Sequence, residues 1–138
     1  MLIVDTNVLI DVFENDPDWS DWSVDRLREH SVVSTLIINP IIYAELSMAF
    51  SKIEKLDAQI AALGLQIREI PRPALFLAAK AFAKYRKQGG TKTNVLADFF
   101  IGAHAAVIEA PVLTRDPARY RSYFPTLRLV TPESERRL

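Results

Sequence analysis

The sequence predicts an α/β fold, a three-layer α/β/α sandwich whose central, mostly parallel sheet is covered by helices on both faces. Short apolar runs alternate along the chain with longer segments of helical periodicity. Strands separated by helices pair in parallel, and the helices then cover the sheet. The 138 residues fit one compact domain, and no repeat or linker divides them, so we expect a single domain over residues 1–138.

The first half of the chain begins with a buried strand at Leu2–Val4. Thr6 is a candidate cap for the helix that follows and ends near Glu14, since threonine is a favoured capping residue. Proline suits the first turn of a helix, which places a helix start at Pro40. In order, the segments expected after Glu14 are a turn at 15–18, a helix at 21–30, a strand within 31–38, a helix from 40 to about 50 and a helix over 52–63.

The second half repeats this alternation after Gly64, which stops the preceding helix. Gly89-Gly90 marks the end of a long helix, because glycine is the preferred residue just past a helix C-terminus. The expected segments are a strand at 65–70, a helix at 73–88, a polar loop, a helix at 95–109, a strand within 111–114, a short helix or turn at 116–124 and a strand at 127–130.

Composition narrows the class of protein. The chain has no cysteine, which excludes disulfides and thiolate metal sites and fits a reducing cytoplasm. No apolar run approaches the roughly 20 residues of a membrane helix. The N-terminal segment has no basic region and contains an aspartate, so it is a poor secretion signal. We therefore expect a cytoplasmic protein with no membrane partner.

Charge is unevenly distributed although the formal net charge is zero. Residues 1–30 carry eight acids against two bases, whereas residues 68–92 carry seven bases against one acid. Residues 115–138 carry six bases against three acids. A basic half beside an acidic one is compatible with steering a phosphate backbone. Solvated helix faces explain individual lysines and arginines equally well.

Three acids lie where the pattern favours a hydrophobic residue. Asp5 directly follows the Leu2–Val4 strand, and ligands of open parallel sheets bind beyond that end of the strands. Glu45 is predicted in mid-helix on an apolar face, and Asp98 opens a helix with apolar residues on its own face. On that face Gly102 would let another backbone approach closely. The neighbours one turn away are Ile41, Ile42, Met48 and Ala49 for Glu45, and Ile101, Gly102 and Ala105 for Asp98.

Each acid also has a structural alternative. Asp5 and Asp98 could cap their helices, and Asp116, which follows the strand within 111–114, could be a turn residue before Pro117. Capping does not explain Glu45, because it lies in mid-helix. A shared cation would explain the four acids together, since a lone buried carboxylate is costly.

The ligand types indicate the chemistry. Sites made of carboxylate oxygens suit Mg²⁺ or Mn²⁺. The two histidines, His30 and His104, are far apart in the sequence, so no zinc site is indicated. Divalent metals of this kind activate water and stabilise charge on an attacked phosphate. The acids therefore predict a metal site that hydrolyses nucleic acid.

The motifs that carry these acids resemble the PIN-domain ribonucleases, and in particular the VapC-like toxins of type II toxin–antitoxin pairs. The matching strings are V-D-T-N-V-L-I-D at 4–11, a mid-helix Glu45, L-A-D-F-F-I-G-A-H-A at 96–105 and L-T-R-D at 113–116. They extend over nearly the whole chain in order and spacing. The resemblance implies a PIN-like fold and cleavage of RNA.

The resemblance also implies roles for individual residues. Asp5, Glu45, Asp98 and Asp116 match the family's four acids around Mg²⁺ or Mn²⁺, with Asp5 and Asp98 as the most direct ligands. Asn7 matches a polar residue that orients the first aspartate, and Thr114 matches a small hydroxyl residue near the fourth acid. The implied partners are RNA, a small VapB-like antitoxin and a second copy of the chain in a homodimer.

Basic residues near the acids are candidates for holding RNA. Arg115, Arg119 and Arg121 flank the fourth acid, and Lys92 and Thr93 lie in the loop before Asp98. A competing interpretation is a non-catalytic module of the same fold whose acids bind a basic partner segment. An aspartyl-phosphate or receiver domain is disfavoured, because Thr6-Asn7 rather than a second aspartate follows Asp5.

Overall fold

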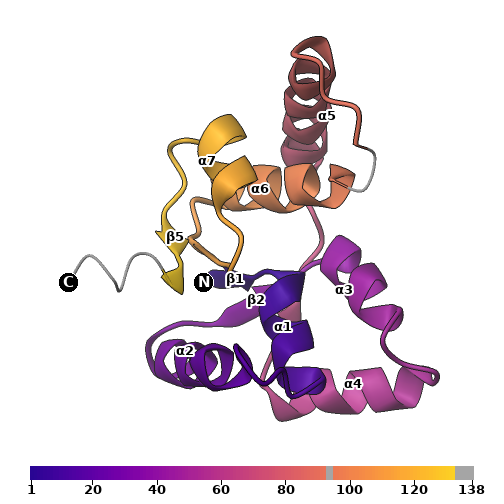
Figure 1. The fold of residues 1–138 in the computed structure, drawn as a ribbon, viewed down its shortest axis with the longest axis vertical. Coiled ribbons are helices and arrows are strands. Elements are labelled where there is room, and N and C mark those ends of the chain that lie inside the picture. The colour runs from indigo at the N-terminus through magenta and orange to yellow at the C-terminus, as the bar shows by residue number, and fades with distance from the viewer. Residues whose placement is uncertain (93–94, 133–138) are drawn as a thin grey trace.

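The computed structural model describes residues 1–92 and 95–132, and within them one parallel sheet organises the chain (Figure 1). Its strand order is β3-β2-β1-β4-β5, and every neighbouring pair is parallel. The strands are β1 (Leu2–Val4), β2 (Leu36–Ile38), β3 (Gln66–Ile67), β4 (Val112–Leu113) and β5 (Leu129–Val130). The predicted parallel sheet is confirmed.

The helices cover both sides of the sheet. Figure 1 shows α1, α2 and α4 below the central strands, α5, α6 and α7 above them, and α3 beside them, so the predicted three-layer arrangement is also confirmed. The helices are α1 (Thr6–Phe13), α2 (Ser20–Val33), α3 (Pro40–Ser47), α4 (Ile53–Ala62), α5 (Arg72–Lys87), α6 (Leu96–Ile108) and α7 (Ala118–Tyr123). Within the described residues, no helix is both long and apolar enough to cross a bilayer.

The central strand β1 is the core of the domain. Leu2, Ile3 and Val4 are at most 1% exposed. Ile3 pairs with Ile37 of β2 on one side and with Val112 of β4 on the other. Burial on both faces explains why this strand is a continuous apolar run rather than an alternating one.

The edge strand β3 is shorter than predicted. The expected strand at 65–70 is reduced to Gln66–Ile67, and both residues are exposed. In the part of the chain that the structure describes, β2 is its single partner. Because an edge strand is held by one partner and little packing, the paired segment is shorter than the apolar run that predicted it.

Three local expectations around the first helices and α6 are corrected. Asp5, not Thr6, is the N-cap of α1, and its carboxylate accepts a hydrogen bond from the Thr6 amide. The predicted apolar face around Glu45 is only partly buried, since Ile42 is fully buried but α3 ends at Ser47 and Met48 is 83% exposed. Gly102 admits the ring of Phe124 rather than a backbone, because a Cβ there would lie 2.5 Å from two ring carbons.

The connections create a switch point in the sheet. The chain runs from β1 outward to β2 and β3 on one side, then crosses to β4 and β5 on the other. After the carboxyl end of β1 the chain therefore continues towards β2, whereas after that of β4 it continues towards β5, on the opposite side of the sheet. Open α/β sheets bind ligands at this position. Asp5 follows β1 there, and Thr114 to Asp116 follow β4.

Candidate functional site

Asp5 lies at the switch point and is almost completely enclosed, with 5% of its surface exposed. Its Oδ1 accepts a hydrogen bond from the Thr6 amide at 2.7 Å. Its Oδ2 accepts hydrogen bonds from the Thr114 hydroxyl at 2.8 Å and from the Tyr120 hydroxyl at 2.9 Å. The carboxylate is therefore fixed by donors from α1, the end of β4 and α7.

The surroundings of Asp5 disfavour its charge in spite of these donors. Burial raises the pKa of Asp5 from its ordinary 3.8 to about 7, and the nearby Asp98 carboxylate adds to the rise. The hydrogen bonds from Thr114, Tyr120 and the Thr6 amide oppose it. Near neutral pH, about half of the Asp5 side chains are therefore protonated, and a nearby cation would favour the carboxylate form.

Asp98 couples the acids of the site to one another. It is in the first turn of α6 but does not cap it, because Val95 is the N-cap residue and makes no side-chain hydrogen bond. Its Oδ2 accepts a hydrogen bond from Arg119 Nη1 at 3.0 Å. The pKa of Asp98 is raised by burial, lowered by Arg119 and raised by the charge of Asp116. The Asp98 charge in turn raises the pKa of Asp5 and of Glu45.

Glu45 reaches the same region from α3. It is half-buried, and its Oε1 accepts a hydrogen bond from the Thr6 hydroxyl at 2.6 Å. The pKa of Glu45 is raised chiefly by burial, with the Thr6 hydrogen bond opposing and the charge of Asp98 adding. Thr6 therefore links the first helix to this acid, a role that its position after Asp5 did not indicate.

The residues expected to support the acids lie beside Asp5. Asn7 Nδ2 is 3.4 Å from Asp5 Oδ2 and 3.3 Å from the Thr114 hydroxyl. The Asn7 carbonyl oxygen accepts a hydrogen bond from the Arg115 amide at 3.1 Å. The Thr114 hydroxyl also accepts one from the Asp116 amide at 3.0 Å. Asn7 and Thr114 thus join the start of α1 to the segment that carries the fourth acid.

The basic residues expected to hold RNA differ in their exposure and in whether they form ion pairs with acids. Arg115 forms a two-point ion pair with Asp11, with Nη2 at 2.8 Å from Oδ1, and lies over the Trp19 ring. Arg119 contacts Asp98, as described above. Lys92 and Arg121 are exposed, and Thr93 lies outside the described residues.

Two further residues belong to this centre that sequence reasoning missed. Tyr120 is 1% exposed and donates a hydrogen bond to Asp5 from a position 115 residues away along the chain. Burial and the charge of Asp5 raise its pKa well above the ordinary value, so its phenol remains a proton donor at neutral pH. Asp11 is 2% exposed and fixes Arg115. A signal for Asp11 was present in the sequence, since this residue ends the string V-D-T-N-V-L-I-D at 4–11.

The donor set fits a hard divalent cation. The candidate ligands are carboxylate oxygens from four segments of the chain, the type that Mg²⁺ and Mn²⁺ prefer. Burial raises the pKa values of Asp5, Glu45 and Asp98, the charge of a neighbouring acid adds to each rise, and a bound cation would oppose both effects. Within residues 1–92 and 95–132, no three acids or histidines converge closely enough to hold an ion as the side chains stand. The Arg119 guanidinium compensates the charge of Asp98.

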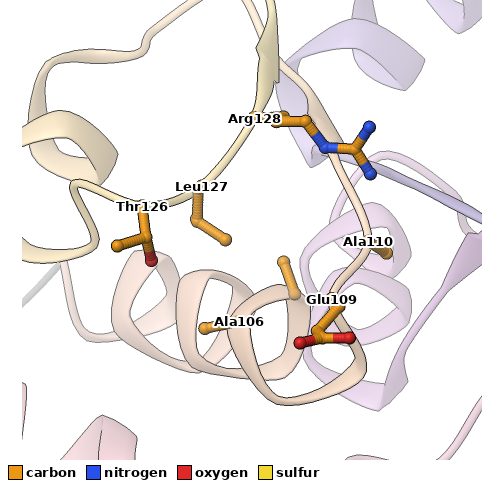
Figure 2. Close-up of a pocket in the computed structure, with 7 residues that line it drawn as sticks. Ala106, Glu109, Ala110, Thr126, Leu127 and Arg128 are labelled. Carbon is orange, nitrogen blue, oxygen red and sulfur yellow. The ribbon is translucent and has the colours of Figure 1, made fainter.

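A separate hollow of about 430 Å³ lies away from the acids, between the C-terminus of α6 and the segment that leads into β5 (Figure 2). It is at the amino ends of β4 and β5, whereas the acids are at the carboxyl ends. Its lining consists of Ala105, Ala106, Glu109, Ala110, Thr126, Leu127 and Arg128. None of the predicted site residues contributes to it.

Comparison with protein families decides the affiliation of the chain. The family model described as PIN domain matches residues 2–124, which include all four acids. The chain belongs to the PIN domain family. The match confirms the family resemblance that the sequence motifs indicated. No curated protein matches the chain.

Solved structures share the fold of this PIN domain at low sequence identity. VapBC2 from Rickettsia felis, bound to a promoter DNA fragment, aligns with a TM-score of 0.73 and 21% identity over 94% of this chain and 97% of that chain. VapBC-1 from nontypeable Haemophilus influenzae gives 0.71 and 20% over 94% and 96%. A toxin–antitoxin complex from Klebsiella pneumoniae gives 0.68 and 22% over 96% and 98%.

Proposed function

We propose that this PIN domain is a Mg²⁺- or Mn²⁺-dependent endoribonuclease. The observation that carries the proposal is the electrostatic coupling of Asp98 to Asp5, Glu45 and Asp116 at the switch point of the sheet. Asp5 is buried and Glu45 and Asp98 are partly buried, so their charged forms are unfavourable without a cation, and acids perturbed in this way concentrate at functional sites.

The chain's own residues would act mainly by positioning. Asp5 and Asp98 would be the principal ligands of the metal, with Glu45 and Asp116 completing its surroundings. The bound metal would supply activated water and stabilise charge on the attacked phosphate. Thr114, Tyr120 and the Thr6 amide hold the Asp5 carboxylate in place, so little reorganisation is needed at the moment of reaction.

We further propose that the protein is the toxin of a VapBC-type pair and acts in the cytoplasm as a homodimer. This proposal is supported by the solved structures that share the fold, which include VapBC structures from several bacteria. The proposed partner is accordingly a small VapB-like antitoxin that blocks the acidic site until it is removed.

The experiment that tests the enzyme proposal is cleavage of RNA by purified protein with Mg²⁺ or Mn²⁺. Asp98→Asn should abolish cleavage and keep the fold, because the amide preserves the shape but removes the charge that binds metal. Asp25→Asn is the matched control, since Asp25 is an exposed residue of α2. Cleavage that survives in Asp98→Asn, or that needs no divalent metal, would contradict the proposal.

The second candidate function is a non-catalytic module that binds a basic partner segment through the same acids. The ion pair between Arg119 and Asp98 favours it, since this pair demonstrates that a guanidinium can occupy the site. A thermal melt distinguishes the two. A metal at 100 times its dissociation constant adds about 2.7 kcal/mol of stability, whereas a melt indifferent to Mn²⁺ would favour the second candidate.

A further inference from the structure

The C-terminal half of α5 and the loop after it form a basic surface without acidic partners. We define the lysine patch as Lys84, Lys87 and Lys92, all exposed. In the described ranges 1–92 and 95–132, none of the three makes an ion pair with an acid. The sequence contains no aspartate or glutamate from 71 to 97. Lys84 and Lys87 are three residues apart and so lie on the same side of the helix.

Tyr85 joins the lysine patch to the acidic site. The Arg119 guanidinium lies 5.8 Å from the centre of the Tyr85 ring and contacts Asp98 at the same time. The Tyr85 hydroxyl accepts a hydrogen bond from the Lys92 amide at 3.2 Å. Lys84 precedes Tyr85 in the chain and Lys92 contacts it through its amide, so the end of α5 that carries the patch is connected to Asp98 through the side chains of Tyr85 and Arg119.

A second tie holds this end of α5 against α7. The Tyr123 hydroxyl donates a hydrogen bond to Gln88 Oε1 at 2.8 Å, and the Tyr85 and Tyr123 rings meet edge to face at 6.0 Å. These contacts fix the end of α5 next to the helix that follows Asp116. The end of α5 that carries the lysine patch therefore lies beside the site.

The arginines near the fourth acid are already engaged in the protein. Arg115 is paired with the buried Asp11 and lies over Trp19. Releasing it to a phosphate would leave Asp11 buried without its cation, which is costly. The lysines of the patch can contact a phosphate without giving up an internal ion pair.

We propose that the lysine patch binds the phosphate backbone of RNA beside the cleavage site. The inference rests on the proposed ribonuclease function and extends it by assigning the path of the substrate. The acids repel phosphates, so the strand must be held by cations next to them. The patch provides such cations along the end of α5 and leads the backbone past Tyr85 to Asp98. Since lysine recognises phosphate as a point charge, the binding is independent of base sequence.

The test is the salt dependence of RNA binding by Lys84→Gln/Lys87→Gln. The control is Lys52→Gln/Lys55→Gln, which removes the same charge at the start of α4, on the opposite side of the molecule from α5 in Figure 1. The probe is a short fluorescent single-stranded RNA of mixed sequence, without divalent metal so that it is not cleaved. Each lost phosphate contact lowers the slope of log affinity against log salt by about 0.7, so the α5 variant should lose about 1.4.

The expected result is a reduced slope for the α5 variant and a wild-type slope for the α4 variant. With Mg²⁺ or Mn²⁺ present, cleavage by the α5 variant should show a raised KM at unchanged kcat, since backbone contacts bind substrate and transition state alike. Equal slopes for the two variants would overturn the inference while leaving the nuclease proposal intact, as would a wild-type slope in the α5 variant. Wild-type protein that neither binds nor cleaves RNA would overturn both.

Discussion

Replacing Asp5 by asparagine should make the metal-free protein more stable at neutral pH. Asp5 is 5% exposed, and its pKa is raised from 3.8 to about 7. A raised pKa means that the folded state binds the proton more tightly than the unfolded state does. The folded protein is therefore stabilised by this group below about pH 4, and the stabilisation is lost as the pH rises to about 7.

The magnitude follows from the difference between the two pKa values. Each pKa unit corresponds to about 1.4 kcal/mol, so ionising Asp5 in the folded protein costs roughly 4 kcal/mol. Asn cannot ionise, and its side chain can still accept from the Thr6 amide and meet the hydroxyls of Thr114 and Tyr120. One imperfect hydrogen bond would offset about 1 kcal/mol of the gain. Near pH 8, the variant should exceed the wild type by a few kcal/mol.

The assay is urea unfolding of both proteins in EDTA at a series of pH values from about 4 to 8. The difference in unfolding free energy between Asp5→Asn and the wild type should grow by up to about 1.4 kcal/mol per pH unit across that window. The other acids with raised pKa values titrate in both proteins, so the difference contains only Asp5 and its charge interaction with Asp98. Adding Mn²⁺ should then stabilise the wild type and leave the variant unchanged.

Two outcomes would refute this reasoning. A difference that does not vary with pH would mean that Asp5 has an ordinary pKa in the folded protein. A variant less stable than the wild type near pH 8 would mean that the hydrogen bonds to the carboxylate outweigh the cost of burying its charge. Either result would remove the electrostatic basis for a cation at this position.

Three further predictions concern single side chains. Tyr120→Phe should weaken Mn²⁺ binding roughly tenfold, since a hydrogen bond to a charged group contributes about 1.5–3 kcal/mol. Tyr123→Phe, which loses only the hydrogen bond to Gln88, should leave Mn²⁺ binding unchanged. Calorimetric titration measures both affinities, and equal effects of the two substitutions would contradict the role of Tyr120. Arg119→Gln should tighten Mn²⁺ binding up to about fivefold, because it removes a part-exposed ion pair with Asp98 that contributes at most about 1 kcal/mol. Unchanged or weaker Mn²⁺ binding would contradict competition between Arg119 and the metal for Asp98. Glu109 has φ 55° at the end of α6, so Glu109→Gly should raise the Tm by about 3 °C, and a lowered Tm would show that Glu109 is not strained.

The order of strands and helices was determined by local patterns in the sequence. The continuous apolar run Leu2–Val4 predicted a strand buried on both faces, and β1 is such a strand. The start of α3 followed from Pro40, and the end of α5 from Gly89. These features depend on residues close together in the chain, so the sequence carries them directly. The extent of β3 does not, because it depends on how many partners the strand acquires.

The acids could be singled out from the sequence as candidates, while their environment could not. Asp5 and Asp98 stand at element ends that a parallel sheet brings to one edge, and both lie within residues 2–124, which match the PIN domain model. The donors that hold Asp5 come from Tyr120 and Thr114, which are 115 and 109 residues away. Contacts over such separations are selected by packing of the whole fold, and no local periodicity encodes them.

Tertiary structure also decided which charged residues are available to a ligand. From the sequence, Arg115 and Lys92 were equivalent candidates for holding RNA. In the folded chain the Arg115 guanidinium is paired with buried Asp11, whereas Lys92 is exposed. The sequence by itself determined the fold class and made the four acids candidates for the site, because both follow from patterns within single elements. The structure decided how the acids are held, compensated and surrounded, because each of these depends on side chains from distant elements meeting at the switch point.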